Sequence, residues 1–206
     1  MHLFDFSKNE RQSLWNELTA MLEEYYENTS GLRVAPELDH KSILKLAGKY
    51  SFEVPVSASD AIAHVVEGIK KYGVQTAHPS YYGLLNPRVN FAAILADMIT
   101  ATLNPQIAAW SHAPFAAEAE NYLIQQFGLK FGFPENSIDG VFCNGGAEAN
   151  HTAVLCAINK DFPGYAEKGL GSCEKKLVLY CSSESHHSIG KAAMMTGLGV
   201  ASVRSV

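Results

Sequence analysis

The last third of the chain alternates short apolar runs with longer amphipathic segments, and this alternation constrains the fold more than any other feature. The apolar runs at 141–143, 176–181 and 200–206 are predicted strands, and the segments at 147–159 and about 187–196 are predicted helices. Strands that alternate with helices favour a parallel sheet with right-handed crossovers. We therefore expect an α/β fold with a mainly parallel sheet.

The first two thirds of the chain are predicted to be helical. Apolar residues recur on one helical face over 14–25 and again over 62–69, and a shorter helix is expected at 40–48. Ser57 and Asp60 form an S-x-x-D signal, which is typical of a helix N-terminus and marks the start of the second long helix.

Two more helices are expected before the alternating region. One begins at about Asn90 and stops before Pro105, which cannot continue a helix. The next begins at Pro114, a residue suited to the first helical turn, and Gly128 is its predicted C-cap. These helices carry little chemistry, so we expect them to pack within the chain or against a partner.

The composition excludes several classes of protein. Hydrophobic residues make up 47% and charged residues 18% of the 206 residues, which argues against a disordered chain. The formal net charge of -5 disfavours a nucleic-acid partner, and no apolar run approaches the ~18 residues that a membrane span needs. The polar N-terminus lacks the pattern of a secretory signal, so we expect a cytoplasmic protein.

The cysteines form no recognisable metal or redox motif. No two of them are spaced as CxxC, so neither a zinc ribbon nor a dithiol site is expected. Most lie in or beside apolar runs, where a reduced and buried thiol is the ordinary state. The four are Cys143, Cys156, Cys173 and Cys181.

The first candidate site is the run GVFCNGGAEAN at 140–150, where a predicted strand leads directly into a predicted helix. Free N–H groups at a helix N-terminus suit a phosphate, and Gly145 and Gly146 let the backbone approach an anion closely. The run matches neither GxGxxG nor the P-loop pattern. A tight turn that merely needs glycine explains it about equally well.

The second candidate site is the run YCSSESHHSIGKAA at 180–193, which also joins the end of a strand to the start of a helix. Ligands bind at that edge of an open α/β sheet. Neighbouring side chains on a helix diverge by about 100°, so His186 and His187 are not expected to share a metal. One of them is suited to stack on a flat ligand or to transfer a proton. The alternative is a capping Ser185 followed by two exposed histidines.

The third candidate is the turn HPSYYGLLNP at 78–87. Tyr81, Tyr82 and Asn86 are suited to form one wall of a pocket, because a proline-anchored turn holds aromatic and amide side chains in place. An aromatic turn packed on the core is an equally good explanation of the same residues.

Taken together and in this order, the three segments resemble the group II pyridoxal-phosphate-dependent decarboxylases. This family includes aromatic-L-amino-acid, histidine and glutamate decarboxylases and has the fold of aspartate aminotransferase, called fold-type I. The family's H-P-x-[FY] corresponds to the turn at 78–87, and its small-residue turn followed by E-A-[NT] corresponds to GGAEAN. Its S-x-x-x-H-x-S-x-x-[KR]-A corresponds to 182–192. The resemblance runs from about residue 10 to the end of the sequence.

The resemblance implies a role for each matched residue. It implies that Lys191 occupies a Lys/Arg position and is not the lysine that bonds the cofactor. The remaining implied roles are phosphate binding for Gly145, Gly146 and Ala147, stacking on the cofactor ring and proton transfer for His186, and the substrate pocket for Tyr82, Asn86 and Pro87.

The resemblance also implies an organisation. Residues 1–85 correspond to a helical arm that wraps the other subunit of a homodimer, and residues 86–206 correspond to the first part of the large cofactor-binding domain. The Schiff-base lysine, the aspartate that pairs with the pyridine nitrogen, and the small domain lie in the family beyond the point that matches Val206. The expectation is the N-terminal half of a pyridoxal 5'-phosphate-dependent amino-acid carboxy-lyase, active only when a second polypeptide supplies the rest.

Two other functions remain open from the residues. One is a truncated, non-catalytic homologue that binds a partner through its helical arm and an open sheet edge. The other is a nucleotide-binding domain with Glu184 as its acidic residue, but Glu184 lies beyond the usual spacing for that role. Neither the motifs nor the composition select which amino acid is the substrate.

Overall fold

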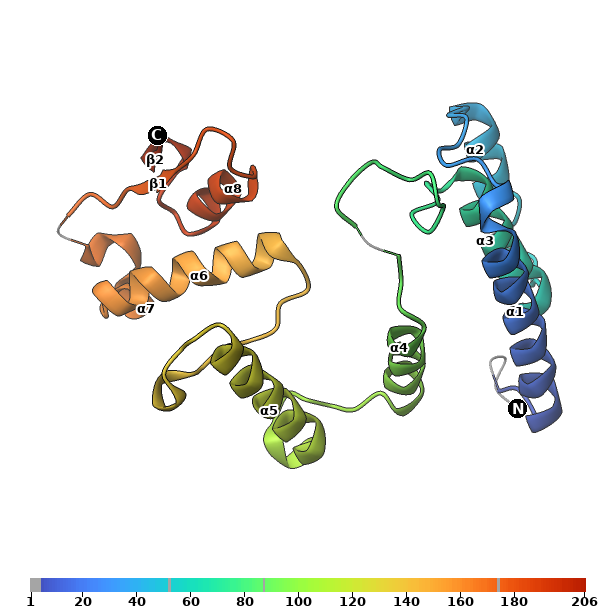
Figure 1. The fold of residues 1–206 in the computed structure, drawn as a ribbon, viewed down its shortest axis with the longest axis horizontal. Helices are drawn as coiled ribbons and strands as arrows, with labels where there is room; N and C mark the ends of the chain where they lie inside the picture. The colour runs from blue at the N-terminus through green and yellow to red at the C-terminus, as the bar shows by residue number, and fades with distance from the viewer. Residues whose placement is uncertain (1–4, 52, 87, 174) are drawn as a thin grey trace. The chain divides into compact units, whose positions relative to one another are not determined.

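The computed structural model describes residues 5–51, 53–86, 88–173 and 175–206. The chain divides into two compact units, one ending at Asn104 and the other beginning at Pro105. The first unit is helical, and the second contains helices and a small parallel sheet (Figure 1). No described helix combines the length and the apolar character needed to span a bilayer.

The first unit is built on two long helices, α1 (Lys8–Asn28) and α3 (Ala58–Tyr72), which pack against each other. Helix α1 begins with a capping box between Ser7 and Glu10. Helix α3 begins as predicted, because the Ser57 side chain accepts a hydrogen bond of 3.0 Å from the Asp60 N–H. The short helix α2 (His40–Ala47) contacts α3 and confirms the helix predicted at 40–48.

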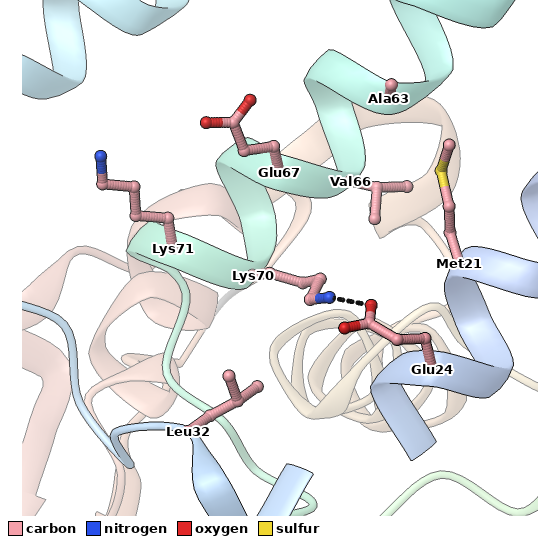
Figure 2. A pocket seen from close by; sticks show the side chains of 8 residues that line it. All are labelled: Met21, Glu24, Leu32, Ala63, Val66, Glu67, Lys70 and Lys71. Carbon is pink, nitrogen blue, oxygen red and sulfur yellow. Dashed lines mark hydrogen bonds and ion pairs between the residues drawn. The ribbon is translucent and has the colours of Figure 1, made fainter. Parts of the chain in front are cut away.

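A shallow pocket of about 420 Å³ lies between α1 and α3. Figure 2 shows Met21 of α1 facing Val66 of α3, and the Lys70 ammonium directed at the Glu24 carboxylate. The Lys70–Glu24 ion pair is partly exposed, so it is worth at most about 1 kcal/mol, and the apolar contacts hold the two helices together. The pocket is the groove that remains where these two helices pack against each other.

The last helix of the first unit is α4 (Phe91–Leu103), which runs as predicted. The Asn90 side chain caps its start, accepting from the Ala92 N–H at 2.8 Å. Asn104 ends it in the left-handed conformation, with φ of 43°, just before Pro105. The large apolar side chains on one side of this helix are not buried: Ile94 is half-buried, and Phe91, Leu95, Met98 and Ile99 are exposed.

In the second unit, 3-10 helix η2 (Trp110–His112) precedes α5 (Pro114–Lys130), which starts at the predicted proline. The predicted C-cap at Gly128 is wrong. Gly128 lies inside α5 and is buried. It packs so closely on Ile138 that a Cβ there would come within 2.4 Å of the Ile138 side chain. The glycine that ends the helix is Gly132, with φ of 81° and the two backbone bonds of a Schellman motif.

Helix α6 (Gly146–Asp161) packs against α8 (Ser188–Met195), and this contact forms the core of the second unit. Ile158 of α6 and Ala192 and Ala193 of α8 are buried. The two alanines are small, so the helix backbones can approach closely. Along the chain, a short helix α7 (Tyr165–Lys168) and a 3-10 helix η4 (Gly169–Ser172) follow α6 and precede α8. The Tyr165 hydroxyl of α7 donates to the Thr196 carbonyl at 3.0 Å.

Two strands, β1 (Leu179–Cys181) and β2 (Val203–Ser205), pair in parallel, with α8 in the connection between them (Figure 1). The register sets Leu179 opposite Val203 and Cys181 opposite Ser205. The α/β fold with a parallel sheet is therefore confirmed. Both strands are shorter than predicted.

Two details of the predicted strands are wrong. The run 141–143 forms no strand among the described residues, because it has no ladder partner there, and Val141 and Phe142 are exposed. Residues 200–202 form the 3-10 helix η5 (Val200–Ser202) rather than strand. The cause is local: Gly199 has φ of 78°, and the Ser202 hydroxyl donates to the Gly199 carbonyl at 2.7 Å.

The second unit contains all four cysteines, and each is a free thiol. Cys143, Cys173 and Cys181 are half-buried, whereas Cys156 is exposed on α6. None of the four is fully buried, so the expectation of buried thiols is wrong, most clearly for Cys156.

Much apolar surface is exposed. The chain exposes 16140 Å², whereas two separate compact units of half its 22.4 kDa each would expose about 11,400 Å² together. The excess includes large apolar side chains on α4 and α5, such as Leu103 at 73%. Apolar faces of this extent are rare on compact monomeric proteins.

We expect Gly128→Ala to lower the free energy of unfolding by about 1–3 kcal/mol, because the new Cβ would overlap Ile138. Helix propensity alone predicts the opposite, a gain of ~1 kcal/mol. Gly68→Ala in α3 is the matched control, since its Cβ meets only Leu46 at 3.7 Å. Urea unfolding followed by circular dichroism measures both variants, and equal gains at the two sites would contradict the packing role of Gly128.

Candidate functional site

A concavity of about 450 Å³ lies at the carboxyl ends of the two parallel strands. Strand β1 ends at Cys181 and β2 at Ser205, and the loop 182–187 follows β1 at the same edge. Ser182, His186 and Lys191 line the concavity together with these strand ends. Open α/β sheets bind ligands at this edge, so the second predicted site lies where a ligand is expected.

The His186 side chain is held by the residue that begins α8. Its Nδ1 lies 2.9 Å from the Ser188 hydroxyl and 3.3 Å from the Ser188 backbone nitrogen, which donates to it. The Ser188 side chain is only 1% exposed. Asn150 of α6 donates from its amide to the same hydroxyl at 2.8 Å. His186 is therefore tied to both helices of the core.

The rings of His186 and His187 lie close together, with centroids 4.0 Å apart and planes tilted by 37°. The pKa of His187 is lowered, first by charge on His186 and second by charge on Lys191, with a smaller effect of desolvation. No cluster of three or more His, Cys, Asp or Glu side chains suited to a metal occurs in the part of the chain that the structure describes.

The glycine turn lies at the start of α6, with Gly145 as N-cap in an extended conformation. A Cβ at Gly145 or Gly146 would meet nothing within 4 Å, so the space beside the turn is open. The first bond of the helical ladder runs from the Ala149 N–H to the Gly145 carbonyl at 3.0 Å. The N–H groups of 146–148 precede that bond and are available to an acceptor such as an anion.

Glu148 is the glutamate of the matched E-A-[NT] motif, but the sequence analysis gave it no role. Its carboxylate accepts a hydrogen bond of 2.8 Å from the Asn144 N–H and so closes the turn. The signal was present, because an acidic residue at the third helical position commonly reaches back to the backbone before a helix. Glu148 shapes the turn without filling the space beside the two glycines.

The third predicted site belongs to the first unit and is ordered by Tyr81. The Tyr81 hydroxyl donates to the Asn86 side-chain carbonyl at 2.7 Å and accepts from the Leu84 N–H at 3.0 Å. A Cβ at Gly83 would come within 2.8 Å of the Tyr81 ring, so the turn closes tightly around this ring. Tyr82 is 89% exposed, and Pro87 lies outside the described residues.

The structure thus brings two of the three predicted sites into one unit. Gly145, Gly146 and Ala147 start the helix that packs on α8, and His186 shortly precedes α8. The hydrogen bond from Asn150 to Ser188 joins the two segments directly. Tyr82 and Asn86 belong to the other unit.

Comparison with known proteins gives a family match. Residues 50–206 match the family model described as the pyridoxal-dependent decarboxylase conserved domain. Mouse CSAD is similar in structure, with a TM-score of 0.83 and 25% sequence identity over 97% of this chain and 42% of its own.

Two further solved structures share the fold at lower identity. The glutamate decarboxylase domain of a diaminobutyrate-pyruvate transaminase and L-2,4-diaminobutyrate decarboxylase from Vibrio parahaemolyticus has a TM-score of 0.80 at 22% identity, covering 100% of this chain and 46% of its own. Catharanthus roseus tryptophan decarboxylase in complex with L-tryptophan has a TM-score of 0.84 at 20% identity, covering 98% and 44%. The chain spans less than half the length of these solved relatives.

We expect the pKa of His187 to lie below the ordinary imidazole value of about 6.5 and to rise in His186→Gln, since charge on His186 is the largest cause of the lowering. Between the lowered pKa and about 6.5 the unfolded chain binds more protons than the folded chain. The free energy of unfolding therefore falls as the pH falls through that window.

An NMR titration of the two imidazoles measures this pKa. The control is Lys191→Met, which should raise the pKa of His187 less than His186→Gln does, because Lys191 is the second cause. A wild-type His187 that titrates at or above the ordinary value would contradict the coupling of the two rings.

Proposed function

Because the chain belongs to the pyridoxal-dependent decarboxylase family, we propose that it forms the N-terminal part of an amino-acid carboxy-lyase that uses pyridoxal 5'-phosphate. The resemblance in the motifs and the incomplete fold-type I domain are both confirmed by the family match and by the solved relatives. The observation that carries the proposal is the direct link between α6, which begins at the glycine turn, and α8, which follows His186.

The cofactor phosphate would be held at the start of α6. The N–H groups of Gly146, Ala147 and the following residue lie ahead of the helical ladder, and the helix dipole favours negative charge there. Gly145 and Gly146 leave open the space that a phosphate needs, since a Cβ at either position meets no atom within 4 Å. The residues present therefore fit the anionic end of this cofactor.

His186 would meet the flat ring of the cofactor. Its imidazole is exposed at the strand edge, and its Nδ1 is held by Ser188. A fixed planar ring stacks on another planar ring without losing much side-chain entropy. When bound, pyridoxal phosphate supplies an electron sink for the charge left on the substrate as carbon dioxide departs. His186 would hold a proton beside the reacting atoms on its free nitrogen.

The substrate we propose is an α-amino acid. The solved relatives include a glutamate decarboxylase domain and a tryptophan decarboxylase in complex with L-tryptophan. Glutamate and tryptophan are both α-amino acids and differ only in the side chain. In the first unit, Tyr81 holds Asn86 in one orientation, and this favours Asn86, with Tyr82 and Pro87, as part of the pocket wall.

We also propose that 1–85 is an arm that binds the other subunit of a homodimer and that 86–206 is the first part of the cofactor domain. The exposed apolar residues of α3, Val65 and Ile69, support the first assignment. The uncovered apolar face of α4 and the short sheet support the second, because further strands and helices would cover them. Activity would then require the remaining half of the domain, with its cofactor-bonding lysine.

The test is to purify the affinity-tagged chain from the cells that make it and to measure bound cofactor by absorbance and carbon dioxide release from candidate amino acids. We expect a polypeptide that supplies the remaining half, bound pyridoxal phosphate, and decarboxylation. His186→Ala should lower the turnover number by at least about a hundredfold. A purified protein that is colourless and inactive with added cofactor would contradict the enzyme and favour a non-catalytic interaction module.

Gly146→Val should weaken cofactor binding in the same purified protein by at least about tenfold, which corresponds to ~1.4 kcal/mol. The valine side chain would fill the open space at the phosphate position without a clash inside the chain. Gly171→Val is the matched control, since its Cβ is equally unhindered and the residue lies in η4. Equal cofactor affinity in both variants, measured by titration with pyridoxal phosphate, would mean that the turn is only structural.

A further inference from the structure

Three side chains from two helices and the loop between β1 and α8 form one hydrogen-bonded line. The Asn150 amide donates to the Ser188 hydroxyl at 2.8 Å, and that hydroxyl lies 2.9 Å from Nδ1 of His186. Ser188 is 1% exposed and Asn150 is half-buried, whereas the His186 ring is exposed. The line therefore runs from the core outward to the ring of the candidate site.

The direction of each bond in this line follows from one donor that cannot reverse. The backbone N–H of Ser188 donates to Nδ1 of His186 at 3.3 Å, and a backbone N–H never accepts. Nδ1 is therefore the acceptor, and a neutral imidazole with an accepting Nδ1 carries its proton on Nε2.

The Ser188 hydroxyl completes the same pattern. It has one proton, which it gives to Nδ1, and its oxygen then accepts from the Asn150 amide. If Asn150 presented its carbonyl instead, that oxygen and Nδ1 would compete for the single hydroxyl proton. Only the amide donor satisfies all three groups in a site where Ser188 is buried.

We propose that Asn150 and Ser188 are positioning residues that hold His186 as the neutral Nε2–H tautomer, with this N–H as a donor on the exposed edge of the ring. The Ser188 bond also fixes the plane of the ring. The catalytic consequence rests on the proposed function: Nε2–H would then be the group that binds an anionic oxygen or delivers a proton beside the substrate. The tautomer itself is a property of this chain and does not depend on the cofactor.

The tautomer is measured on the full chain, without cofactor, by long-range ¹H–¹⁵N NMR of the imidazoles at a pH where they are neutral. We expect wild-type His186 to show an unprotonated Nδ1 and a protonated Nε2. Asn150→Asp is the decisive variant, since aspartate has almost the same shape and can only accept. It should draw the Ser188 proton away from Nδ1 and lower the ratio of Nε2–H to Nδ1–H by about fivefold, the effect of losing one ordinary hydrogen bond.

Two controls separate this inference from a loss of structure and from the proposed function. His187 provides an internal control, because its tautomer should stay unchanged in Asn150→Asp. Asn150→Thr keeps a hydroxyl donor and Asn150→Val offers no acceptor for the Ser188 proton, so both should leave the His186 ratio closer to the wild type than Asn150→Asp does. A wild-type His186 with a protonated Nδ1, or a ratio of Nε2–H to Nδ1–H that is unchanged in Asn150→Asp, would overturn the proposal even if the purified protein releases carbon dioxide. The expected tautomer with no carbon dioxide release would support the proposal and contradict the decarboxylase.

Discussion

The packing of α6 on α8 is the contact on which the rest of the second unit depends. Two alanines of α8 bring the helices close, and the buried Ser188 hydroxyl receives the amide of Asn150 across the contact. Each helix begins at a segment that carries functional groups, since α6 begins at the glycine turn and α8 begins directly after His186 and His187. The contact therefore holds the glycine turn and an imidazole at a fixed relation, which neither helix could do alone.

The apolar core is small, and large apolar faces are left exposed. Ile158, Ala192 and Ala193 are the apolar residues fully buried in the part of the chain that the structure describes, while large side chains of α4 and α5 are exposed. Burying one such side chain is worth roughly 1.5–3 kcal/mol, so faces of this size favour association strongly. The solved relatives are more than twice as long as this chain.

Features that depend on neighbouring residues were predicted well from the sequence. The starts of α3, α4 and α5 follow from Ser57, Asn90 and Pro114, because a helix cap satisfies backbone groups within three residues. Features that depend on distant residues were predicted poorly. Gly128 looked like a cap because its contact with Ile138 lies ten residues away, and the run 141–143 looked like a strand although strand formation needs a partner from elsewhere.

The amino-acid sequence by itself determined the family, the parallel α/β class and the order of the three motifs, because these are encoded in local spacing and residue type. Only the tertiary structure decided that Asn150 reaches Ser188, that Tyr81 holds Asn86, and that Nδ1 of His186 accepts a hydrogen bond. The physical reason is that a hydrogen bond requires donor and acceptor within about 3 Å. For Asn150 and Ser188, which are 38 residues apart, only the packing of α6 on α8 brings the two atoms to that distance.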